Sequence, residues 1–511
     1  MGADAVNLRP DPVPRWQRPD VIGLVAICLV LSLGFLGLRG IWDPDEGRYT
    51  NVALTMLDTG NWLDPMRNED TGHWTKPPVT YWLVAGSVSL FGHSPWAARL
   101  PIALSYLACM LFAGLCARRL VPGAVPLAVI VYATMIIPSV AGQLVTTDFP
   151  LAASLAFAMY AFVEYRFGPE FQSRRWWILM WVAFGIAFMT KGPPALVPLL
   201  AVLAMSLLAP GPKISAWWRS FGVVTFLVIA LPWYIAVTLK HDGLLQYFLG
   251  AELVDRVATA RFGRHSEWYG WLQVYLPTLA LGTLPWSLDL WRWARSLPTR
   301  ARAWRDKQVR VQDARRLLIA LWIVIPVVVF CVAQSRLPLY LLPTFVPLAL
   351  AISAQRNEAG RGMPRWPWLV LWVALLLGAR AGAAYMPTHK DASKWAEAIK
   401  ERVAGGPIHE VVFVEDMARY GLHMHLDTEI EKLSRLPMKE SRFNPEYDEA
   451  LMREVDEVGE EPGLIFVTKA KTWPEIAQSI AARGYTAQPL GTPYQGRVIF
   501  IVHPPQETTP R

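Results

Sequence analysis

The sequence is poor in charged residues and in cysteine. Charged side chains make up 18% of its 511 residues, against about 25% in ordinary soluble domains. Hydrophobic residues make up 53%, and 24 residues are tryptophan. This composition excludes an ordinary soluble protein and predicts an integral membrane protein with a smaller part that faces water.

The four cysteines lie in apolar segments without the spacing of metal ligands: Cys28, Cys109, Cys116 and Cys331. Membrane burial does not favour disulfides between them, so we interpret them as small buried side chains. The C-terminal part lacks a glycine-rich phosphate loop and a nucleotide-binding fingerprint. No small-residue cleavage site follows the first apolar run, which we interpret as a retained membrane span rather than a signal peptide.

The net charge of +8 follows from membrane topology and requires no nucleic-acid partner. Basic residues gather at every second loop, and the loop 291–316 has nine basic and two acidic residues. Because lysine and arginine accumulate on the cytoplasmic side of membrane proteins, this alternation places the N-terminal tail, 1–20, in the cytoplasm. An odd number of spans then places the C-terminal part in the periplasm, outside the inner membrane.

Apolar runs predict a mainly α fold, a polytopic membrane helix bundle of about 11–13 spans, because about 20 residues cross a bilayer as a helix. The transmembrane domain covers 21–386, with eleven runs at 21–39, 98–117, 124–141, 149–165, 176–190, 193–209, 219–239, 268–290, 316–333, 338–354 and 367–386. The outer loop 40–97 contains two further stretches, 46–58 and 77–92. We expect these two to be helices that lie along the membrane surface among the lipids.

The composition changes after about Met386 to that of a soluble domain, 387–511. Apolar stretches predict buried strands, and two segments have helical patterning: strands at 411–414, 463–467 and 498–502, helices at 393–403 and 473–483. Ser393 is the expected N-cap of the first of these helices. The alternation of strands and helices predicts a small soluble α/β domain.

A cluster of charges directly follows the first apolar run: Asp43-Pro44-Asp45-Glu46-Gly47-Arg48-Tyr49. Charges beside a membrane are costly to desolvate, so this cluster indicates polar chemistry at the lipid surface. A carboxylate here could position or deprotonate an acceptor. Asp45 and Glu46 could instead cap the helix that follows, because carboxylates favour the first turn of a helix.

Further polar residues fall in the other loops on the same predicted side: Lys76 before Pro77-Pro78, Asp148, Lys191, Arg256, His265, Arg336 and Tyr340. Each has a structural alternative, such as an N-cap for Asp148, a snorkelling side chain for either lysine, a solvated loop face for Arg256 or an interfacial aromatic for Tyr340. Their shared side favours a common site, in which the cations bind a phosphate.

Taken in order, these motifs resemble the polyprenyl-phosphate-dependent glycosyltransferases with the GT-C membrane fold. They are most similar to the bacterial 4-amino-4-deoxy-arabinose transferases of lipid A and their protein-mannosyltransferase-like relatives. The resemblance covers about residues 20–355. The residues that carry it are Asp45-Glu46-Gly47-Arg48-Tyr49, Lys76-Pro77-Pro78 with Tyr81-Trp82, and Arg336-Leu337-Pro338-Leu339-Tyr340-Leu341-Leu342-Pro343, with weaker support from Asp148 and Met189-Thr190-Lys191-Gly192.

The resemblance implies a transferase that moves a sugar from a polyprenyl-phosphate donor to a lipid A-like lipid or another cell-envelope acceptor, among membrane lipids. It implies that Asp45 and Asp148 are the catalytic carboxylates, with Asp148 facing the sugar or the acceptor. The implied substrate-binding residues are Glu46, Arg48, Tyr49, Lys76, Lys191, Arg256, His265, Arg336 and Tyr340. Among these, Lys76, Arg256 and Arg48 would hold the lipid phosphate, and Tyr340 would close over it.

Two positions depart from the arabinose transferases, which usually have a glutamate where Thr75 stands and a histidine where Leu253 stands. The sugar and the use of a divalent metal therefore stay open, and no other cofactor is predicted. A protein hydroxyl is an alternative acceptor. Alternatives of another class are a lipid or solute transporter (a flippase) and a non-catalytic scaffold for the C-terminal domain. Transporter sites usually lie near mid-membrane between repeated halves, whereas here the charges gather on one side and no half is repeated.

Overall fold

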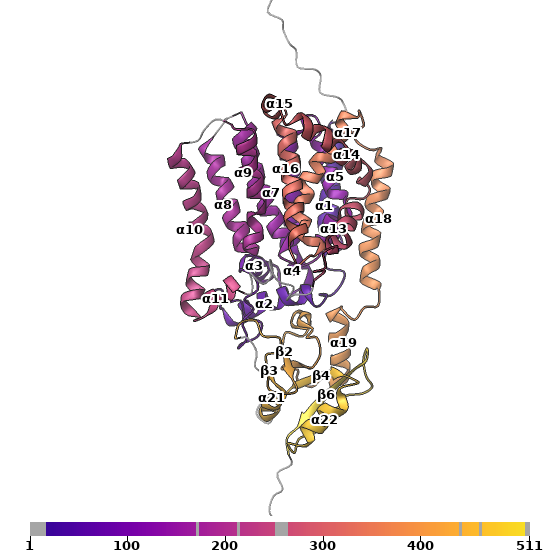
Figure 1. Cartoon of the computed structure of the whole chain (residues 1–511). Helices are drawn as coiled ribbons and strands as arrows, with labels where there is room; N and C mark the ends of the chain where they lie inside the picture. Colours follow the sequence, from indigo (N-terminus) through magenta and orange to yellow (C-terminus); the bar gives the residue numbers. More distant parts are fainter. Residues whose placement is uncertain are drawn as a thin grey trace, which may run out of the picture.

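The computed structural model describes residues 17–169, 173–211, 215–250, 264–438, 442–458 and 462–505. A bundle of long helices forms one part of the molecule, and a small domain with a sheet sits against one end of it (Figure 1). Two shorter helices, α2 (Asp45–Thr59) and α3 (Val79–Phe91), lie at the boundary between these parts. The predicted helices at 46–58 and 77–92 are thereby confirmed as helices.

The bundle consists mainly of apolar helices. Five of the described helical segments are long and apolar enough to cross a membrane: Pro95–Leu120, Arg219–Lys240, Ala314–Val332, Pro338–Glu358 and Trp366–Tyr385. The bundle helices include α1 (Gln17–Leu33), α4 (Pro95–Leu120), α7 (Asp148–Phe167), α8 (Arg174–Lys191), α9 (Val197–Leu208), α10 (Ala216–Lys240), α16 (Ala314–Val332), α17 (Phe345–Glu358) and α18 (Trp366–Tyr385). The chain is therefore an integral membrane protein.

Two of the predicted spans are interrupted. The run 124–141 is divided into α5 (Val125–Thr134) and α6 (Ile136–Ala141) by Met135, which is extended at φ −66° and ψ 140°. The run 268–290 is divided into α13 (Gly270–Gly282) and α14 (Ser287–Ala303). Pro285 lies in the second break, where it has no amide hydrogen to continue a helix.

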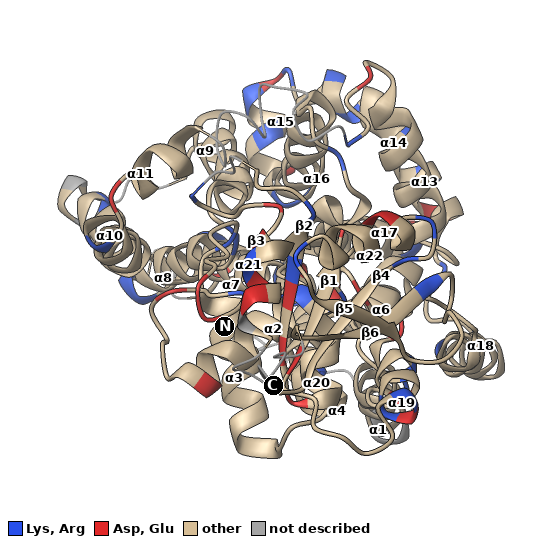
Figure 2. Ribbon diagram, turned by 90° about the horizontal axis from the view of Figure 1, so that it is seen from below, with Lys and Arg blue, Asp and Glu red and all other residues tan. Residues whose placement is uncertain are grey.

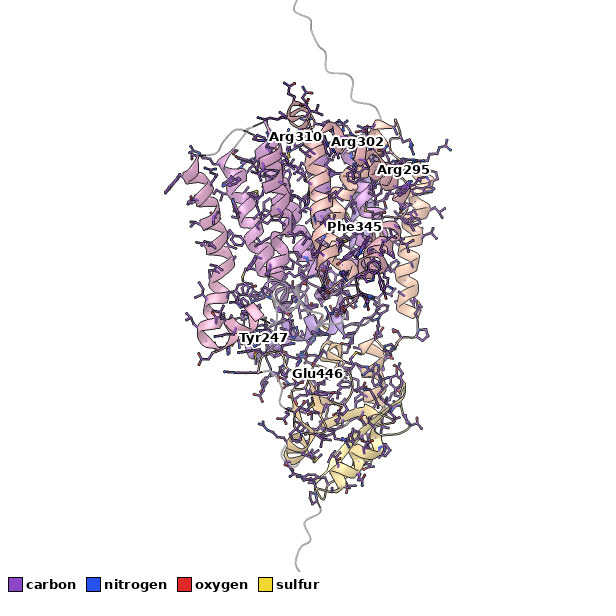
Figure 3. All side chains as sticks on the ribbon, in the orientation of Figure 1. Tyr247, Arg295, Arg302, Arg310, Phe345 and Glu446 are labelled. Atoms are coloured by element: carbon purple, nitrogen blue, oxygen red, sulfur yellow. The ribbon has the colours of Figure 1, made fainter. Side chains whose placement is uncertain are left out.

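The basic segment 291–316 is helical rather than a loop, which corrects the prediction. Helix α14 runs through its first half, and α15 (Lys307–Gln312) follows. Figure 3 places Arg295, Arg302 and Arg310 at the end of the bundle that lies farthest from the small domain. The basic segment and the C-terminal domain therefore occupy opposite ends of the molecule.

The C-terminal domain is a six-stranded mixed sheet in the order β3-β2-β1-β4-β6-β5. The strands are β1 (Glu410–Val414), β2 (Glu429–Ser434), β3 (Glu449–Ala450), β4 (Leu464–Lys469), β5 (Thr486–Pro489) and β6 (Arg497–His503). The first four are parallel to one another, and β6 is antiparallel to both β4 and β5. Seen from its own side, the sheet overlies the middle of the bundle (Figure 2).

Strand β1 is buried on both faces because helices cover the sheet from both sides. Val411 and Phe413 pack in the core that contains α19 (Ala392–Val403). Val412 and Val414 pack in the opposite core, with α21 (Leu451–Glu457) and α22 (Trp473–Ala481). This division follows from the alternation of side chains along a strand, and it confirms the predicted α/β domain.

The N-cap of α19 differs from the prediction. Asp391, rather than Ser393, is the capping residue, and its side chain accepts a hydrogen bond from the Ser393 amide at 3.0 Å. A carboxylate at this position satisfies one of the free amides of the first turn. Asp391 also forms a β-bridge with Trp42, so the helix begins where the C-terminal domain meets the first outer loop.

Candidate active site

Helix α2 presents two faces with different surroundings. Asp45, Arg48 and Tyr49 are spaced at i, i+3 and i+4, which places them on one side of the helix. Asp45 is exposed, and the other two are partly buried. Glu46 and Thr50 lie on the other side and are buried. The two consecutive carboxylates therefore point into different environments.

The Glu46 carboxylate is surrounded by donors from α4, from the segment between α1 and α2, and from the segment before α7. Arg99 of α4 donates from Nε to Oε1 and from Nη2 to Oε2, both at 3.0 Å, and Arg39 forms a second ion pair with Oε2. The amides of Trp42 and Val145 donate to the same carboxylate, at 3.0 and 3.1 Å. We call these side chains, Glu46, Arg99 and Arg39, the sealed cluster.

The electrostatics of the sealed cluster keep Glu46 ionised. Burial alone would raise the pKa of Glu46, but the charges and hydrogen bonds of Arg99 and Arg39 outweigh it and lower the pKa to about 2. Glu46 is 1% exposed. It is not an N-cap of α2, and its carboxylate faces the bundle rather than the side of Asp45. The geometry favours a structural role over the predicted substrate contact.

The opposite face of α2 meets the ends of two bundle helices. Lys191, the last residue of α8, forms an ion pair with Asp148 at the start of α7, with 2.5 Å between Nζ and Oδ1. The Lys191 ammonium lies 4.9 Å from the ring centre of Tyr340, which comes from η3 (Pro338–Thr344). Asp148 is thus bound to a lysine, and Thr147 is the N-cap of α7.

Tyr49 joins this ion pair to α2. Its burial raises the pKa of the Tyr49 hydroxyl, Lys191 and Arg48 act to lower it, and Asp148 and Asp45 act to raise it further. All four charges therefore lie within interaction range of the Tyr49 hydroxyl. With Tyr340, these residues form what we call the open cluster: Asp45, Arg48, Tyr49, Asp148, Lys191 and Tyr340.

Lys76 lies with a second group of cations beside the open cluster. The pKa of His73 is held well below its usual value by burial and by the nearby charges of Arg48, Arg67 and Lys76. Arg48 therefore belongs to both groups. The Nε2 atom of His73 lies 2.8 Å from the hydroxyl of Thr75.

A cavity of about 450 Å³ lies between the first outer loop and the C-terminal domain. This volume falls in the range of about 300–1,000 Å³ that is common for small-ligand sites. Glu446, which Figure 3 places at the boundary between the two domains, lies in its wall. The lining residues are Pro44, Arg48, Arg67 and His73 from the loop, and Glu415, Asp416, Met417, Ala418, Tyr420, Lys432, Asn444, Pro445, Glu446, Tyr447 and Lys469 from the C-terminal domain.

Arg336 binds backbone carbonyls. Its guanidinium donates to the carbonyls of His265, Glu267 (2.9 Å) and Cys331 (3.1 Å). Arg336 is 4% exposed, and its amide donates to the Arg264 carbonyl at 3.0 Å. The side chain thus fixes the segment that enters α13, and this geometry favours a structural role. His265 itself is exposed, with φ +53°.

Arg256 and Leu253 lie outside the described residues, so their predicted places in the site stay predictions. Three residues in and around the candidate site were not predicted: Arg99, Arg67 and His73. The sequence could have indicated Arg99, because it lies at the start of the apolar run 98–117 and a charge in a membrane segment needs a partner. Nothing in the sequence distinguishes Arg67 or His73 from other loop residues.

Metal binding was left open by the sequence. Across the described ranges, no group of three or more histidine, cysteine, aspartate or glutamate side chains is arranged to hold a metal ion. Segment 251–263 lies outside those ranges.

Comparison with known proteins identifies the fold. Residues 75–236 match the dolichyl-phosphate-mannose-protein mannosyltransferase family. In the solved structures, the chain superimposes on ArnT from Cupriavidus metallidurans bound to undecaprenyl phosphate with a TM-score of 0.73, 19% identity and coverage of 96% of this chain and 99% of that chain. The chain has the ArnT-like GT-C fold. The predicted membrane bundle with a C-terminal α/β domain is thereby confirmed.

Two curated relatives are similar in sequence. Both are named undecaprenyl phosphate-alpha-4-amino-4-deoxy-L-arabinose arabinosyl transferase 1. The protein of Pseudomonas fluorescens (strain Pf0-1) is 30% identical over 354 residues, and that of Sodalis glossinidius (strain morsitans) is 32% identical over 346 residues. Each alignment covers 66% of this chain, and this chain spans 57% and 59% of the length of these relatives. The GT-C chain therefore resembles the aminoarabinose transferases, as its motifs predicted.

Proposed function

We propose that this protein is a membrane glycosyltransferase that moves a sugar from a polyprenyl-phosphate-linked donor to an acceptor of the cell envelope. The observation that carries the proposal is the open cluster, in which residues 45, 48, 49, 148, 191 and 340 meet at one end of the bundle. It combines two carboxylates, Asp45 and Asp148, with two cations, Arg48 and Lys191. Transfer of a sugar from a lipid phosphate needs both kinds of group.

The cations bind the donor phosphate. Breaking the bond between the anomeric carbon and the phosphate oxygen leaves polyprenyl phosphate with an added negative charge. Fixed cations stabilise that charge best where water is partly excluded. Arg48 and Lys76 supply positive charge from the first outer loop, and Lys191 supplies it from the end of α8; Arg256 is a further expected contributor. Tyr340, against Lys191, closes the phosphate side.

The carboxylates act on the acceptor and the sugar. Asp45 is exposed on the open face of α2, where it can orient an acceptor or accept its proton. Asp148 is fixed by Lys191 at 2.5 Å, which suits a residue that holds a hydroxyl or amino group of the sugar. The acceptor oxygen attacks the anomeric carbon as the phosphate leaves, and a single displacement inverts that centre.

The names of the relatives support the donor class. The matching curated proteins are named for an undecaprenyl-phosphate sugar, and the ArnT structure with the same fold was solved with undecaprenyl phosphate. The cavity between the domains is the place we assign to the polar part of the acceptor, because Arg48 faces both it and the open cluster.

The test is a transfer assay with the purified full chain and polyprenyl-phosphate sugars. Comparing a phosphate-bearing glycolipid with a hydroxyl-bearing peptide as acceptor separates two acceptor classes. An ionised phosphate needs only positioning, whereas a serine or threonine hydroxyl needs a base, so Asp45→Asn should be nearly inactive with the peptide. Movement of lipid or solute without glycosyl transfer would support the transporter alternative instead.

The orientation is part of the proposal. The basic helices α14 and α15 lie at the end opposite the C-terminal domain (Figure 3), and basic residues accumulate on the cytoplasmic side. We therefore expect the open cluster and the C-terminal domain in the periplasm and the N-terminus in the cytoplasm. In a variant whose native cysteines are replaced, Lys390→Cys should react with an impermeant thiol reagent in whole cells, and Arg305→Cys should not. The reverse pattern would contradict this orientation.

A further inference from the structure

The C-terminal domain holds the segment that leads into α2. The Asp43 carboxylate accepts from the Gly421 amide, with 3.1 Å to Oδ1 and 3.3 Å to Oδ2. The Asp43 amide donates to the Lys390 carbonyl at 2.9 Å, and the Ala392 amide donates to the Ile41 carbonyl at 2.9 Å. Backbone from both domains thus forms an isolated antiparallel β-bridge. Asp43, which is 1% exposed, lies inside this contact between the two domains, which we call the joint.

The packing around Asp43 leaves no room for a side chain at two glycines. A Cβ on Gly47 would collide with Asp43 Oδ1 and lie 2.6 Å from the Gly421 nitrogen. A Cβ on Gly421 would lie 2.9 Å from the Ala392 Cβ and 3.0 Å from Asp43 Oδ2. Such close approach of backbones requires glycine. The first turn of α2 and η4 (Tyr420–Leu422), which contains Gly421, therefore fix each other's position.

The C-terminal domain also follows α2 beyond its first turn. His423, in α20 (His423–Leu426), lies with Nδ1 2.9 Å from Asn51 Oδ1 and with Nε2 3.0 Å from Asp58 Oδ2. Asn51 and Asp58 are two turns apart on α2, so one histidine spans that length. The helix that carries Asp45 is consequently held on one side by the bundle, through Glu46, and on another by the C-terminal domain.

We propose that the C-terminal domain fixes the geometry of the transferase site through its contacts with the start of α2, and that Asp43 is a positioning residue for Asp45. This inference rests on the proposed function. Only Pro44, with φ −87°, separates Asp43 from Asp45, so a shift of Asp43 passes directly into the first turn of α2. Asp43 does not touch the substrate. It determines where the Asp45 carboxylate projects, and a displacement of about 1 Å can lower a rate by about 100-fold.

The protonation of Asp43 makes asparagine a close substitute. Burial raises the pKa of Asp43 to about 8, while the Gly421 amide and Arg419 oppose this rise. Near neutral pH the side chain therefore carries a proton for much of the time. The Asp43→Asn variant would keep an oxygen that accepts from the Gly421 amide, whereas Asp43→Ala would remove the contact.

The experiment measures kcat and donor KM of the full chain in the transfer assay, together with the folded fraction by size-exclusion chromatography. We expect Asp43→Ala to lower kcat per folded enzyme by about tenfold or more, with donor KM nearly unchanged, and Asp43→Asn to restore most of it. Gly421→Ala disturbs the same joint from the C-terminal domain and should lower kcat in the same way. It replaces Asp43→Ala if that variant does not fold.

The matched control is Glu429→Ala. Glu429 makes the same kind of contact between the domains, accepting from the Glu69 amide at 2.8 Å, but away from the start of α2. Its kcat should stay at the wild-type value. Wild-type kcat in folded Asp43→Ala or Gly421→Ala overturns the inference, as does an equal loss in Glu429→Ala. An inactive wild-type protein instead contradicts the proposed function, and the inference falls with it.

Discussion

Two neighbouring carboxylates on helix α2 have opposite surroundings. Glu46 belongs to the sealed cluster, is 1% exposed and accepts from two arginines and two backbone amides. Asp45 belongs to the open cluster and is exposed. They are adjacent in sequence, but a helix turns by about 100° per residue, so one faces the bundle and the other faces the site.

This difference separates stability from chemistry within one motif. The sealed cluster satisfies its charges internally and joins α2 to α4 and to the segment that follows α1, so it holds the site in place. The open cluster contains the charge that the substrate is expected to meet. A carboxylate used in catalysis must remain accessible, whereas one buried with arginines is already satisfied. The two clusters should therefore respond differently to substitution.

The largest expected effect is the loss of transfer activity on substitution of a residue of the open cluster. Asp45→Asn should lower the transfer rate by about 10²–10⁴-fold, because removal of a general base or an acceptor-positioning group has effects of that size. Its melting temperature should stay near that of the wild type, since an exposed side chain is replaced. A radiometric transfer assay and a thermal melt on the same preparation measure both. Wild-type transfer by Asp45→Asn would refute the catalytic role.

The corresponding substitution in the sealed cluster is Glu46→Gln. It leaves Arg99 and Arg39 buried without a counter-charge, which costs about 3–5 kcal/mol of stability when a buried pair is broken. The measurement is the melting temperature in detergent, with Asp45→Asn as the control of equal chemistry. If Glu46→Gln melted normally but lost donor binding, Glu46 would be a substrate residue, as the sequence predicted.

Lys191 tests the part of the open cluster that comes from α8. Lys191→Met should lower kcat/KM for the donor by about 100-fold, because it removes a cation beside the leaving phosphate and leaves Asp148 without its partner. Lys191→Arg keeps the charge and should retain more activity. Equal activity of the methionine variant and the wild type would remove Lys191 from the donor site.

The smallest effect is a pH dependence of stability. The folded-state pKa of Glu46 is about 2 against an ordinary 4.5, so its contribution to stability is present above pH 4.5 and is lost as the pH falls toward 2. Asp43 has the opposite sign. Its pKa rises from 3.8 to about 8, so its contribution is full below pH 3.8 and is lost as the pH rises through 8.

Thermal melts across this range separate the two residues. Glu46→Gln should flatten the acid limb of the stability profile, and Asp43→Asn should flatten the alkaline limb. The same limb changing in both variants would contradict the assigned pKa directions. Asp45→Asn serves as the control, because it makes the same chemical change at an exposed carboxylate.

Much of the fold was predictable because it depends on local pattern. Long apolar runs have only the helix as a way to satisfy their backbone in lipid, and short continuous apolar stretches indicate buried strands. The convergence of Asp45, Arg48 and Tyr49 follows from helical spacing alone. The break at Pro285 and the helical form of the basic segment needed more than hydropathy, because α14 is amphipathic rather than uniformly apolar.

The parts that could not be predicted depend on contacts between distant residues. Glu46 meets Arg99 across 53 positions, and Asp43 meets Gly421 across 378. A sequence motif does not show which of its carboxylates has a buried partner. Arg336 shows the same limit, because a charge in an outer loop is as well suited to backbone carbonyls as to a phosphate.

The most direct test of the central claim is photocrosslinking with a polyprenyl phosphate that carries a photoreactive group beside the phosphate. If the open cluster holds the donor, labelled peptides should come from α2, the end of α8 and η3, and unlabelled polyprenyl phosphate should compete. Labelling confined to α14 and α15, at the opposite end of the bundle, would contradict the account.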